Sequence, residues 1–290
     1  MPFRFRKMLD MSTVSNSGAV IRETPCKTLL NRSGISDYSL NCYGGCTHAC
    51  AYCYARFMQR FHPHEEPWGG YVDVKNNAVE VLERQLRRLA PGDVFVSSAC
   101  DGWQPLEGER KLTRECCRLL IRHGFQVNAL TKSALILRDL DIFAGSSAQI
   151  GVTVTTLDPK LAALWEPFAS PVEERFRVIE EARGAGLTTS IMFGPLLPFL
   201  SDDYKSVHAL LERAAALHID KIWVDAFNPR PKVWESASAL LDRVFPDLRE
   251  RYARVLFSPP VRTAYLAGLR DRVALAARRL HLTERVSGCS

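Results

Sequence analysis

Three cysteines stand within eight residues of one another, at Cys46, Cys50 and Cys53. The spacing CxxxCxxC lets a single short loop wrap one metal centre. Four thiolates usually hold an iron–sulfur cluster, so a loop with three thiols leaves one iron without a protein ligand. An open metal position can bind a substrate or cofactor, by the logic that separates catalytic from structural zinc sites. The spacing therefore favours an iron–sulfur cluster with one open iron.

Two other uses of the cysteines are weaker. A structural zinc site normally takes four nitrogen or sulfur ligands, often from two CxxC pairs. Here Cys42 and His48 are the nearby candidates for a fourth ligand, and the sequence has no second CxxC. A disulfide framework is disfavoured because nine cysteines is an odd number in a chain without signs of secretion.

The cysteine motif is followed by Tyr54-Ala55, and in this it resembles the cluster loop of radical S-adenosylmethionine (SAM) enzymes. More narrowly, Tyr52-Cys53-Tyr54 is similar to the spore photoproduct lyase superfamily. The resemblance implies that the three cysteines hold a [4Fe–4S] cluster whose fourth iron chelates SAM. It also implies that one electron from the cluster splits SAM to methionine and a 5′-deoxyadenosyl radical, while the protein positions the cofactor and excludes side reactions. A donor such as flavodoxin or ferredoxin would supply that electron.

The elements that must position this loop alternate between strands and helices. Strands are expected at residues 37–42, 93–98, 126–131, 149–155, 188–193 and 220–227, and helical spacing of apolar residues separates most of them. Such alternation implies right-handed βαβ units and a parallel sheet. Six strands are too few to close an eight-stranded barrel. The sequence therefore predicts an α/β fold, a partial (βα)6 TIM-type barrel with functional side chains at the carboxyl ends of its strands.

Three regions are expected along the chain. Residues 1–36 show no clear period and predict an arm over the main domain, residues 37–230 the partial barrel, and residues 231–290 a helical, basic extension over its side or mouth. Residues 56–71 are aromatic and basic. Such a segment can stack on nucleic-acid bases or pack as a loop over the cluster, and both interpretations stay open.

Polar residues follow the predicted strands. Lys132 follows the third strand, where its ammonium can pair with a carboxylate such as that of SAM, and a lysine in the family's matching Thr-Lys pair contacts SAM. A solvated surface lysine is the alternative. Ser97 and Ser98, after the second strand, are further candidates for cofactor contacts.

Further cofactor contacts are implied by the resemblance. Thr153 and Thr155 resemble polar positions on the family's fourth strand that face SAM, although threonine is common on either face of a strand. Glu166, Ser170 and Arg175 belong to a block that resembles Glu-Pro-x-x-Ser-Pro-x-x-x-Arg in the family. Arg175 either binds the SAM carboxylate or pairs with Glu166.

The resemblance also suggests catalytic residues. Cys100 resembles the cysteine with which spore photoproduct lyases return a hydrogen atom to the product radical. Tyr52 and Tyr54 match the family's tyrosine pair around the third cluster cysteine, which implies roles in handling SAM and relaying the radical. Here, however, Asp101 follows Cys100 directly, and residues 101–107 (DGWQPLE) resemble the D-x-[YW]-Q-P-x-E signature of a wider branch. Whether Cys100 is a hydrogen donor or a packing residue therefore stays open, as does a DNA lesion as the substrate.

Length, composition and net charge indicate the general class of protein. The 290-residue chain is 47% hydrophobic and 24% charged, as in ordinary globular proteins. Its net charge of +6 is compatible with a polyanionic partner. Without an apolar run of membrane length or a signal-peptide pattern, we expect a cytoplasmic protein with reduced thiols.

Three functions fit these observations. The first is a radical SAM enzyme acting on DNA or another nucleic acid, and the second is a radical SAM enzyme acting on a peptide or small molecule. The third is a non-enzymatic iron–sulfur or zinc module that binds nucleic acid. The sequence predicts no oligomeric state.

Overall fold

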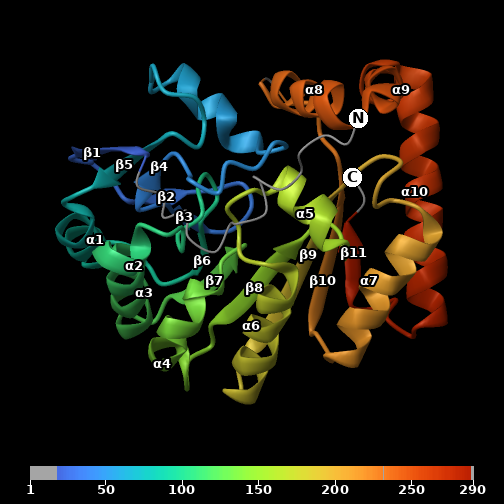
Figure 1. The fold of residues 1–290 in the computed structure, drawn as a ribbon. Coiled ribbons are helices and arrows are strands. Elements are labelled where there is room, and N and C mark those ends of the chain that lie inside the picture. Colours follow the sequence, from blue (N-terminus) through green and yellow to red (C-terminus); the bar gives the residue numbers. More distant parts are fainter. Residues whose placement is uncertain (1–17, 231, 289–290) are drawn as a thin grey trace.

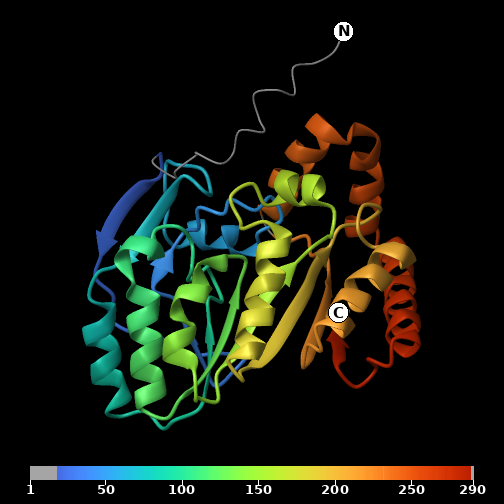
Figure 2. The same cartoon turned by 60° about the horizontal axis from the view of Figure 1, so that its bottom comes forward.

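The computed structural model describes residues 18–230 and 232–288. Residues 1–17 of the predicted arm, and residues 231 and 289–290 of the predicted extension, lie outside these ranges. The fold is built on an eight-stranded sheet in the order β11-β10-β9-β8-β7-β6-β3-β2. Helices cover one face of this sheet, side by side (Figures 1 and 2).

The six central strands of the sheet are parallel, and they match the six predicted strands. They are β3 (Tyr38–Leu40), β6 (Asp93–Val96), β7 (Gln126–Thr131), β8 (Gln149–Val154), β9 (Thr188–Leu196) and β10 (Lys221–Ala226). The predicted partial barrel is confirmed. Two short edge strands were not predicted: β2 (Leu30–Arg32) pairs antiparallel with β3, and β11 (Val286–Gly288) pairs parallel with β10.

Amphipathic helices connect these strands. They are α1 (Ala78–Leu86), α2 (Glu107–Arg110), α3 (Leu112–Arg122), α4 (Leu140–Phe143), α5 (Pro159–Trp165), α6 (Val172–Gly184) and α7 (Tyr204–Ala216). In α3, the side chains of Thr113, Cys116 and Leu120 are buried, three and four residues apart, so this face packs inward. Two 3₁₀ helices, η3 (Tyr54–Arg60) and η4 (Ala134–Asp139), lie in the loops. None of the helices in the described ranges is long and apolar enough to cross a membrane.

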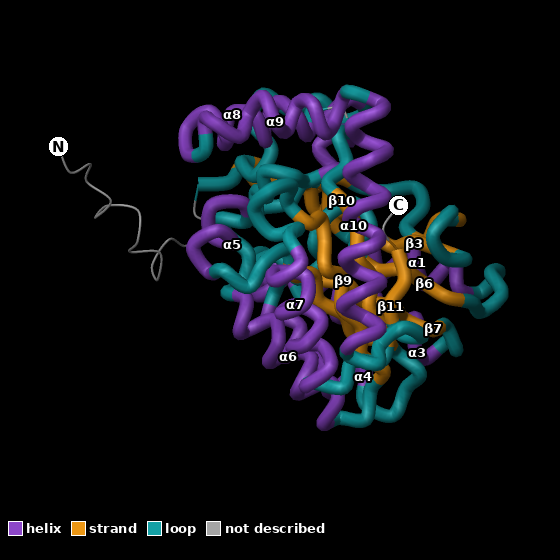
Figure 3. The backbone as a smooth tube through the Cα atoms, turned by 90° about the vertical axis from the view of Figure 1, so that its right-hand side faces the viewer, coloured by secondary structure: helices purple, strands orange, loops and turns teal. Residues whose placement is uncertain are grey.

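The helical C-terminal region lies over both the side and the end of the sheet. It comprises α8 (Val233–Val244), α9 (Pro246–Phe257) and α10 (Pro259–Arg279). Helix α10 packs against α7 and β10, and α8 and α9 lie across one end of it (Figure 3). Side chains of α8 and α9 form one apolar cluster with Tyr52 and Trp165. The extension therefore reaches the cysteine loop, in agreement with its expected position over the side or mouth.

A second, three-stranded sheet was not predicted. Its order is β1-β5-β4, formed by β1 (Val20–Thr24), β5 (Tyr71–Lys75) and β4 (Tyr43–Gly44). The chain that enters β5 presses against the cysteine loop: at Gly69, where φ is +101°, an added Cβ would lie 2.5 Å from the Ala49 Cβ. Of the two interpretations of residues 56–71, the structure therefore supports packing over the loop.

Candidate active site

One cavity runs from the carboxyl ends of β6–β10 along the inner face of these strands. Its volume is about 620 Å³, within the usual range for ligand pockets. Its wall includes most of the predicted site residues, namely Cys46, Cys50, Tyr52, Cys53, Tyr54, Ser97, Cys100, Lys132 and Thr153. Residues that are more than 100 positions apart in sequence thus face one space.

The cysteine loop is held in two tight turns. The Ala49 amide donates to the Cys46 carbonyl at 3.3 Å, and the Cys53 amide donates to the Cys50 carbonyl at 3.2 Å. Just before the loop, Gly45 has φ +79°, and an added Cβ would lie 2.5 Å from the Tyr71 carbonyl oxygen. This close approach excludes any larger residue. The turns bring all three thiols to the same cavity wall.

Burial and backbone N–H groups act in opposite directions on the pKa values of the thiols. Burial raises the pKa of all three thiols, to about 12 for Cys50. Backbone N–H groups oppose this effect, from Asp101 beside Cys46 and from Ala55 beside Cys53. A metal deprotonates coordinating thiols outright, and hydrogen bonds to the sulfurs are part of what tunes a cluster.

The spacing of the thiols suits a cluster better than a single ion. Within residues 18–230 and 232–288, no three His, Cys, Asp or Glu side chains gather closely enough to hold one metal ion. A [4Fe–4S] cluster makes a different demand, because each thiolate binds a different iron. Three thiols that line one cavity, buried at Cys46 and Cys50 and half-buried at Cys53, therefore fit the cluster that the sequence predicts.

Lys132 lies at the cysteine-loop end of the cavity and is half-buried. Its Nζ is 5.6 Å from the centre of the Tyr52 ring, in a cation–π contact. Burial lowers the pKa of Lys132, but nearby Cys50 and Glu166 raise it by a larger amount. The pKa of Lys132 therefore lies above its usual value, and the ammonium stays charged. A charged lysine beside the thiols can pair with the carboxylate of a bound cofactor.

Arg175 is bound to protein groups instead of facing the cavity. Its Nη2 lies 2.5 Å from Glu166 Oε2, and both side chains are almost completely buried. The remaining guanidinium donors reach the carbonyls of Thr153 at 2.9 Å and Ser170 at 2.8 Å. Of the two alternatives for Arg175, the structure therefore shows the ion pair with Glu166, which corrects its assignment as a cofactor contact.

Thr155 and Ser98 also lie behind the cavity wall. The Thr155 hydroxyl donates to Glu166 Oε1 at 2.7 Å and lies 3.0 Å from the Tyr52 hydroxyl, which itself donates to Glu166. The Ser98 hydroxyl accepts from Asn41 Nδ2 at 2.8 Å. Both hydroxyls are bound to protein groups, and their role as cofactor contacts stays a prediction. Ser97 and Thr153 remain on the cavity wall.

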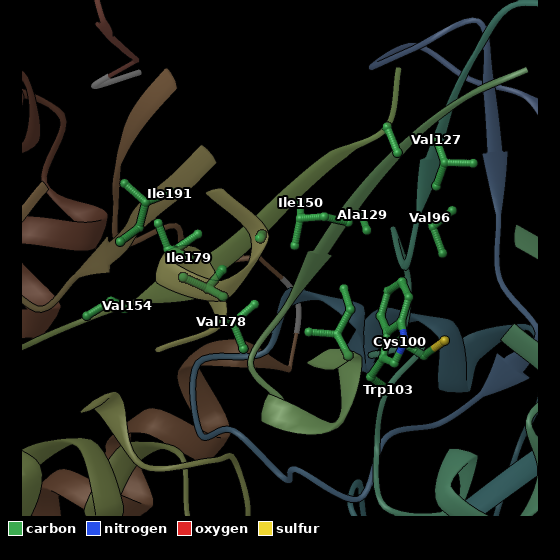
Figure 4. Packing of buried hydrophobic residues seen from close by; sticks show 14 of the residues in the cluster. Val96, Cys100, Trp103, Val127, Ala129, Ile150, Val154, Val178, Ile179 and Ile191 are labelled. Carbon is green, nitrogen blue, oxygen red and sulfur yellow. The ribbon is translucent and has the colours of Figure 1, made fainter. Parts of the chain in front are cut away.

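Cys100 borders both the core and the cavity. It is 8% exposed, packs beside Trp103 (Figure 4) and contributes to the cavity wall. Its thiol donates toward Asn41 Oδ1 at 3.8 Å. Burial raises the pKa of Cys100 to about 12, so the sulfur carries its hydrogen at neutral pH. This position is compatible with both interpretations of Cys100.

Tyr54 lies at the mouth of the cavity and is 46% exposed. Its hydroxyl donates to the carbonyl of Ser98, two residues before Cys100. The guanidinium of Arg230, which follows β10, lies 5.7 Å from the centre of the Tyr54 ring. Tyr54 thus connects the cysteine loop to the loops after β6 and β10.

Asn41 is a site residue that the sequence interpretation missed. Its carboxamide accepts from the Ala99 amide at 2.8 Å, donates to Ser98 and meets the Cys100 thiol. It therefore shapes the turn that carries Cys100. A signal was present, because Asn41 is the polar residue at the end of the first predicted strand.

Comparison with known proteins identifies the family to which this geometry belongs. The model of the radical SAM superfamily matches residues 40–211. The chain belongs to the radical SAM superfamily. It is 31% identical over 275 residues to the uncharacterized protein Rv2578c of Mycobacterium tuberculosis, covering 89% of this chain and 80% of that one. It is 32% identical over 190 residues to the uncharacterized protein MJ0683 of Methanocaldococcus jannaschii, covering 64% and 71%.

Solved structures of spore photoproduct lyase share the fold of this radical SAM protein. Spore photoproduct lyase complexed with dinucleoside spore photoproduct matches with a TM-score of 0.64 and 12% identity, covering 92% of this chain and 82% of that one. A mutant of the lyase with bound AdoMet and the same dinucleoside matches with a TM-score of 0.60, at 12% identity, covering 84% and 81%. The predicted radical SAM fold of the spore photoproduct lyase type is therefore confirmed.

Proposed function

We propose that this protein is an enzyme in which Cys46, Cys50 and Cys53 hold a [4Fe–4S] cluster and Lys132 binds the carboxylate of SAM. The observation that carries the proposal is the meeting of the three thiols and the charged Lys132 on one cavity wall. When bound, the cluster supplies the electron that cleaves SAM to methionine and a 5′-deoxyadenosyl radical. Tyr52 lies under the Lys132 ammonium and keeps it at the cluster end of the cavity.

Cys100 has a separate role in this proposal. Its S–H bond is weaker than most C–H bonds, so the thiol can give its hydrogen atom to a carbon radical on the substrate, which leaves a thiyl radical on the sulfur. The protonated state and the place of Cys100 on the cavity wall support this role. Tyr54 positions the turn before Cys100 through the Ser98 carbonyl.

The substrate that we propose is a nucleic acid. Support comes from the fold shared with a lyase that binds a dinucleoside photoproduct, and from the net charge of +6. A peptide or small molecule is the competing class. Affinity for single- and double-stranded DNA, measured at several salt concentrations, separates the two, because contacts to phosphates weaken steeply with salt.

The proposed chemistry is tested by anaerobic reconstitution with iron and sulfide. The loaded protein is then incubated with SAM and dithionite, and 5′-deoxyadenosine is measured by mass spectrometry. We expect a brown protein that forms deoxyadenosine. A colourless, zinc-only protein that leaves SAM intact would contradict the proposal.

A further inference from the structure

Residues 101–107, between β6 and α3, reach across to the cysteine loop. Gln104 is completely buried. Its Oε1 accepts from the Thr47 amide at 2.9 Å and from the Thr47 hydroxyl at 3.3 Å, and its Nε2 donates to the Gly45 carbonyl at 3.3 Å. These partners are the two residues on either side of Cys46. One carboxamide thus fixes the backbone around the first thiol.

Asp101 joins the same loop to the end of β7. Its carboxylate accepts from the Thr131 hydroxyl at 2.6 Å and the Lys132 amide at 2.8 Å, and it lies 3.4 Å from His48 Nδ1. One carboxylate therefore links the cysteine loop to the residue proposed to bind SAM.

The rest of the segment is anchored on its other side. Trp103 Nε1 donates to Asp139 Oδ2 at 2.9 Å, and Glu107 accepts from the Thr113 and Arg114 amides, each at 3.0 Å. These contacts fix the segment to η4 and α3 without touching the cysteine loop. The segment is thus supported from behind while Asp101 and Gln104 hold the loop in front.

We propose that Asp101 and Gln104 are positioning residues that set the distance between the cluster and Lys132. The inference deepens the proposed function and rests on it for the identity of the cluster. Gln104 acts through the backbone beside Cys46, so it controls how firmly the cluster is retained. Asp101 acts through His48 and Lys132, so it controls SAM affinity. In metal sites, removing an outer partner of a ligand typically costs 10–100-fold in affinity or activity.

The first experiment compares three variants of the full chain, loaded with cluster under anaerobic conditions. Gln104→Leu removes the contacts to the loop, Asp101→Asn weakens the link to β7, and Trp103→Phe is the control that disturbs the same buried segment without touching the loop. We expect Gln104→Leu to lose iron to EDTA about tenfold faster than the wild type, and Trp103→Phe less than about twofold faster. Gln104→Glu keeps the acceptor for Thr47 and should recover part of the retention.

The second experiment measures SAM affinity, which tests the role proposed for Asp101 and not that of Gln104. The dissociation constant of SAM should rise about tenfold in Asp101→Asn and change little in Trp103→Phe. The electron paramagnetic resonance signal of the reduced cluster on adding SAM provides a further check, because it responds to geometry at the cluster. If Asp101→Asn and Trp103→Phe had equal SAM affinities and equal resonance signals, the role of Asp101 would be overturned.

A cluster-free measurement keeps this inference distinct from the proposed function. In the full chain without iron, iodoacetamide should alkylate Cys46 faster in Gln104→Leu than in Trp103→Phe, because only the first change frees the loop. Equal alkylation together with equal iron retention would overturn the role of Gln104. If the wild type assembled no cluster, the proposed function would fail, and Cys46 alkylation would still decide whether Gln104 holds the loop.

Discussion

The two walls of the cavity are built differently. On and behind the wall made by the ends of β6–β8, Asp101 and Glu166 respectively are bound by several protein donors and are largely shielded from water. On the wall made by β9 and β10, Trp223 and Asp225 are half-buried and Asn228 is exposed. A satisfied, rigid wall can hold a cofactor in one place, whereas a more open wall leaves room for a substrate. The difference suggests that the cofactor side is fixed before the substrate arrives.

The largest effect expected on the rigid wall is loss of the cluster. Changing any one of Cys46, Cys50 and Cys53 to Ala should abolish the visible absorbance and the bound iron while leaving the fold largely intact. Cys42→Ala is the control, since Cys42 is buried four residues before the loop and does not line the cavity. Cluster loss in Cys42→Ala, with retention in Cys53→Ala, would show that the ligands are assigned wrongly.

The buried ion pair should dominate the stability of the rigid wall. Arg175→Met leaves Glu166 without its charged partner, and breaking a buried pair in this way costs about 3–5 kcal/mol. Arg177→Met on the same helix is the control, because its side chain is 57% exposed and its ion pairs lie at the surface. Urea unfolding of the cluster-free protein measures both free energies. Similar losses in the two variants would remove the contrast between the buried pair and the surface pairs.

Substitutions of two lysines, one at each end of the cavity, allow a direct comparison of the two ends. Lys132→Ala should weaken SAM binding by about 1.5–3 kcal/mol, the range for a charge-assisted contact. Lys221 lines the same cavity at the other end of the strands, so Lys221→Ala should leave the affinity unchanged. Calorimetry on cluster-loaded protein tests both. If Lys132→Ala bound SAM as the wild type does, Lys132 would not be a SAM contact.

Cys100 gives the smallest change in stability and the most specific change in chemistry. Cys100→Ala and Cys117→Ala should each cost about 1 kcal/mol in the free energy of unfolding. Only Cys100→Ala should change the products, because an unquenched substrate radical goes on to side reactions. Thiol hydrogen exchanges with solvent, so turnover in D₂O should label the wild-type product and not that of Cys100→Ala. Identical labelling in both would make Cys100 a packing residue.

The parallel sheet was predictable because short strands rich in buried apolar residues alternate along the chain with segments of helical spacing. The second sheet was not, for physical reasons that its strands make clear. Strand β4 has only two residues, and β1 is exposed at most positions, so neither carries the pattern of a buried strand. Strand β5 begins at the end of the aromatic segment of residues 56–71, so the sequence pattern does not show where the strand starts. Such strands exist only because a partner is present.

The site was predictable where chemistry depends on local spacing. The cysteine loop and Lys132, the residue after β7, can each be recognised from a few neighbouring positions of the sequence. The contacts of Gln104 with Gly45 and Thr47 join positions more than 50 residues apart, and the same is true of Asp101 and His48. For Arg175, two partners were compatible with the sequence, and only the buried contact with Glu166 decides between them.

The pairing of β11 with β10 has a consequence for synthesis of the chain. Strand β11 covers the edge of β10, yet it is translated only after α8, α9 and α10. At typical rates of about 5–20 residues per second, the edge of β10 waits on the order of seconds for its neighbour. Uncovered strand edges are templates for pairing between chains. Nascent chains on one messenger can therefore pair through the edge of β10 in that interval, before β11 emerges from the ribosome.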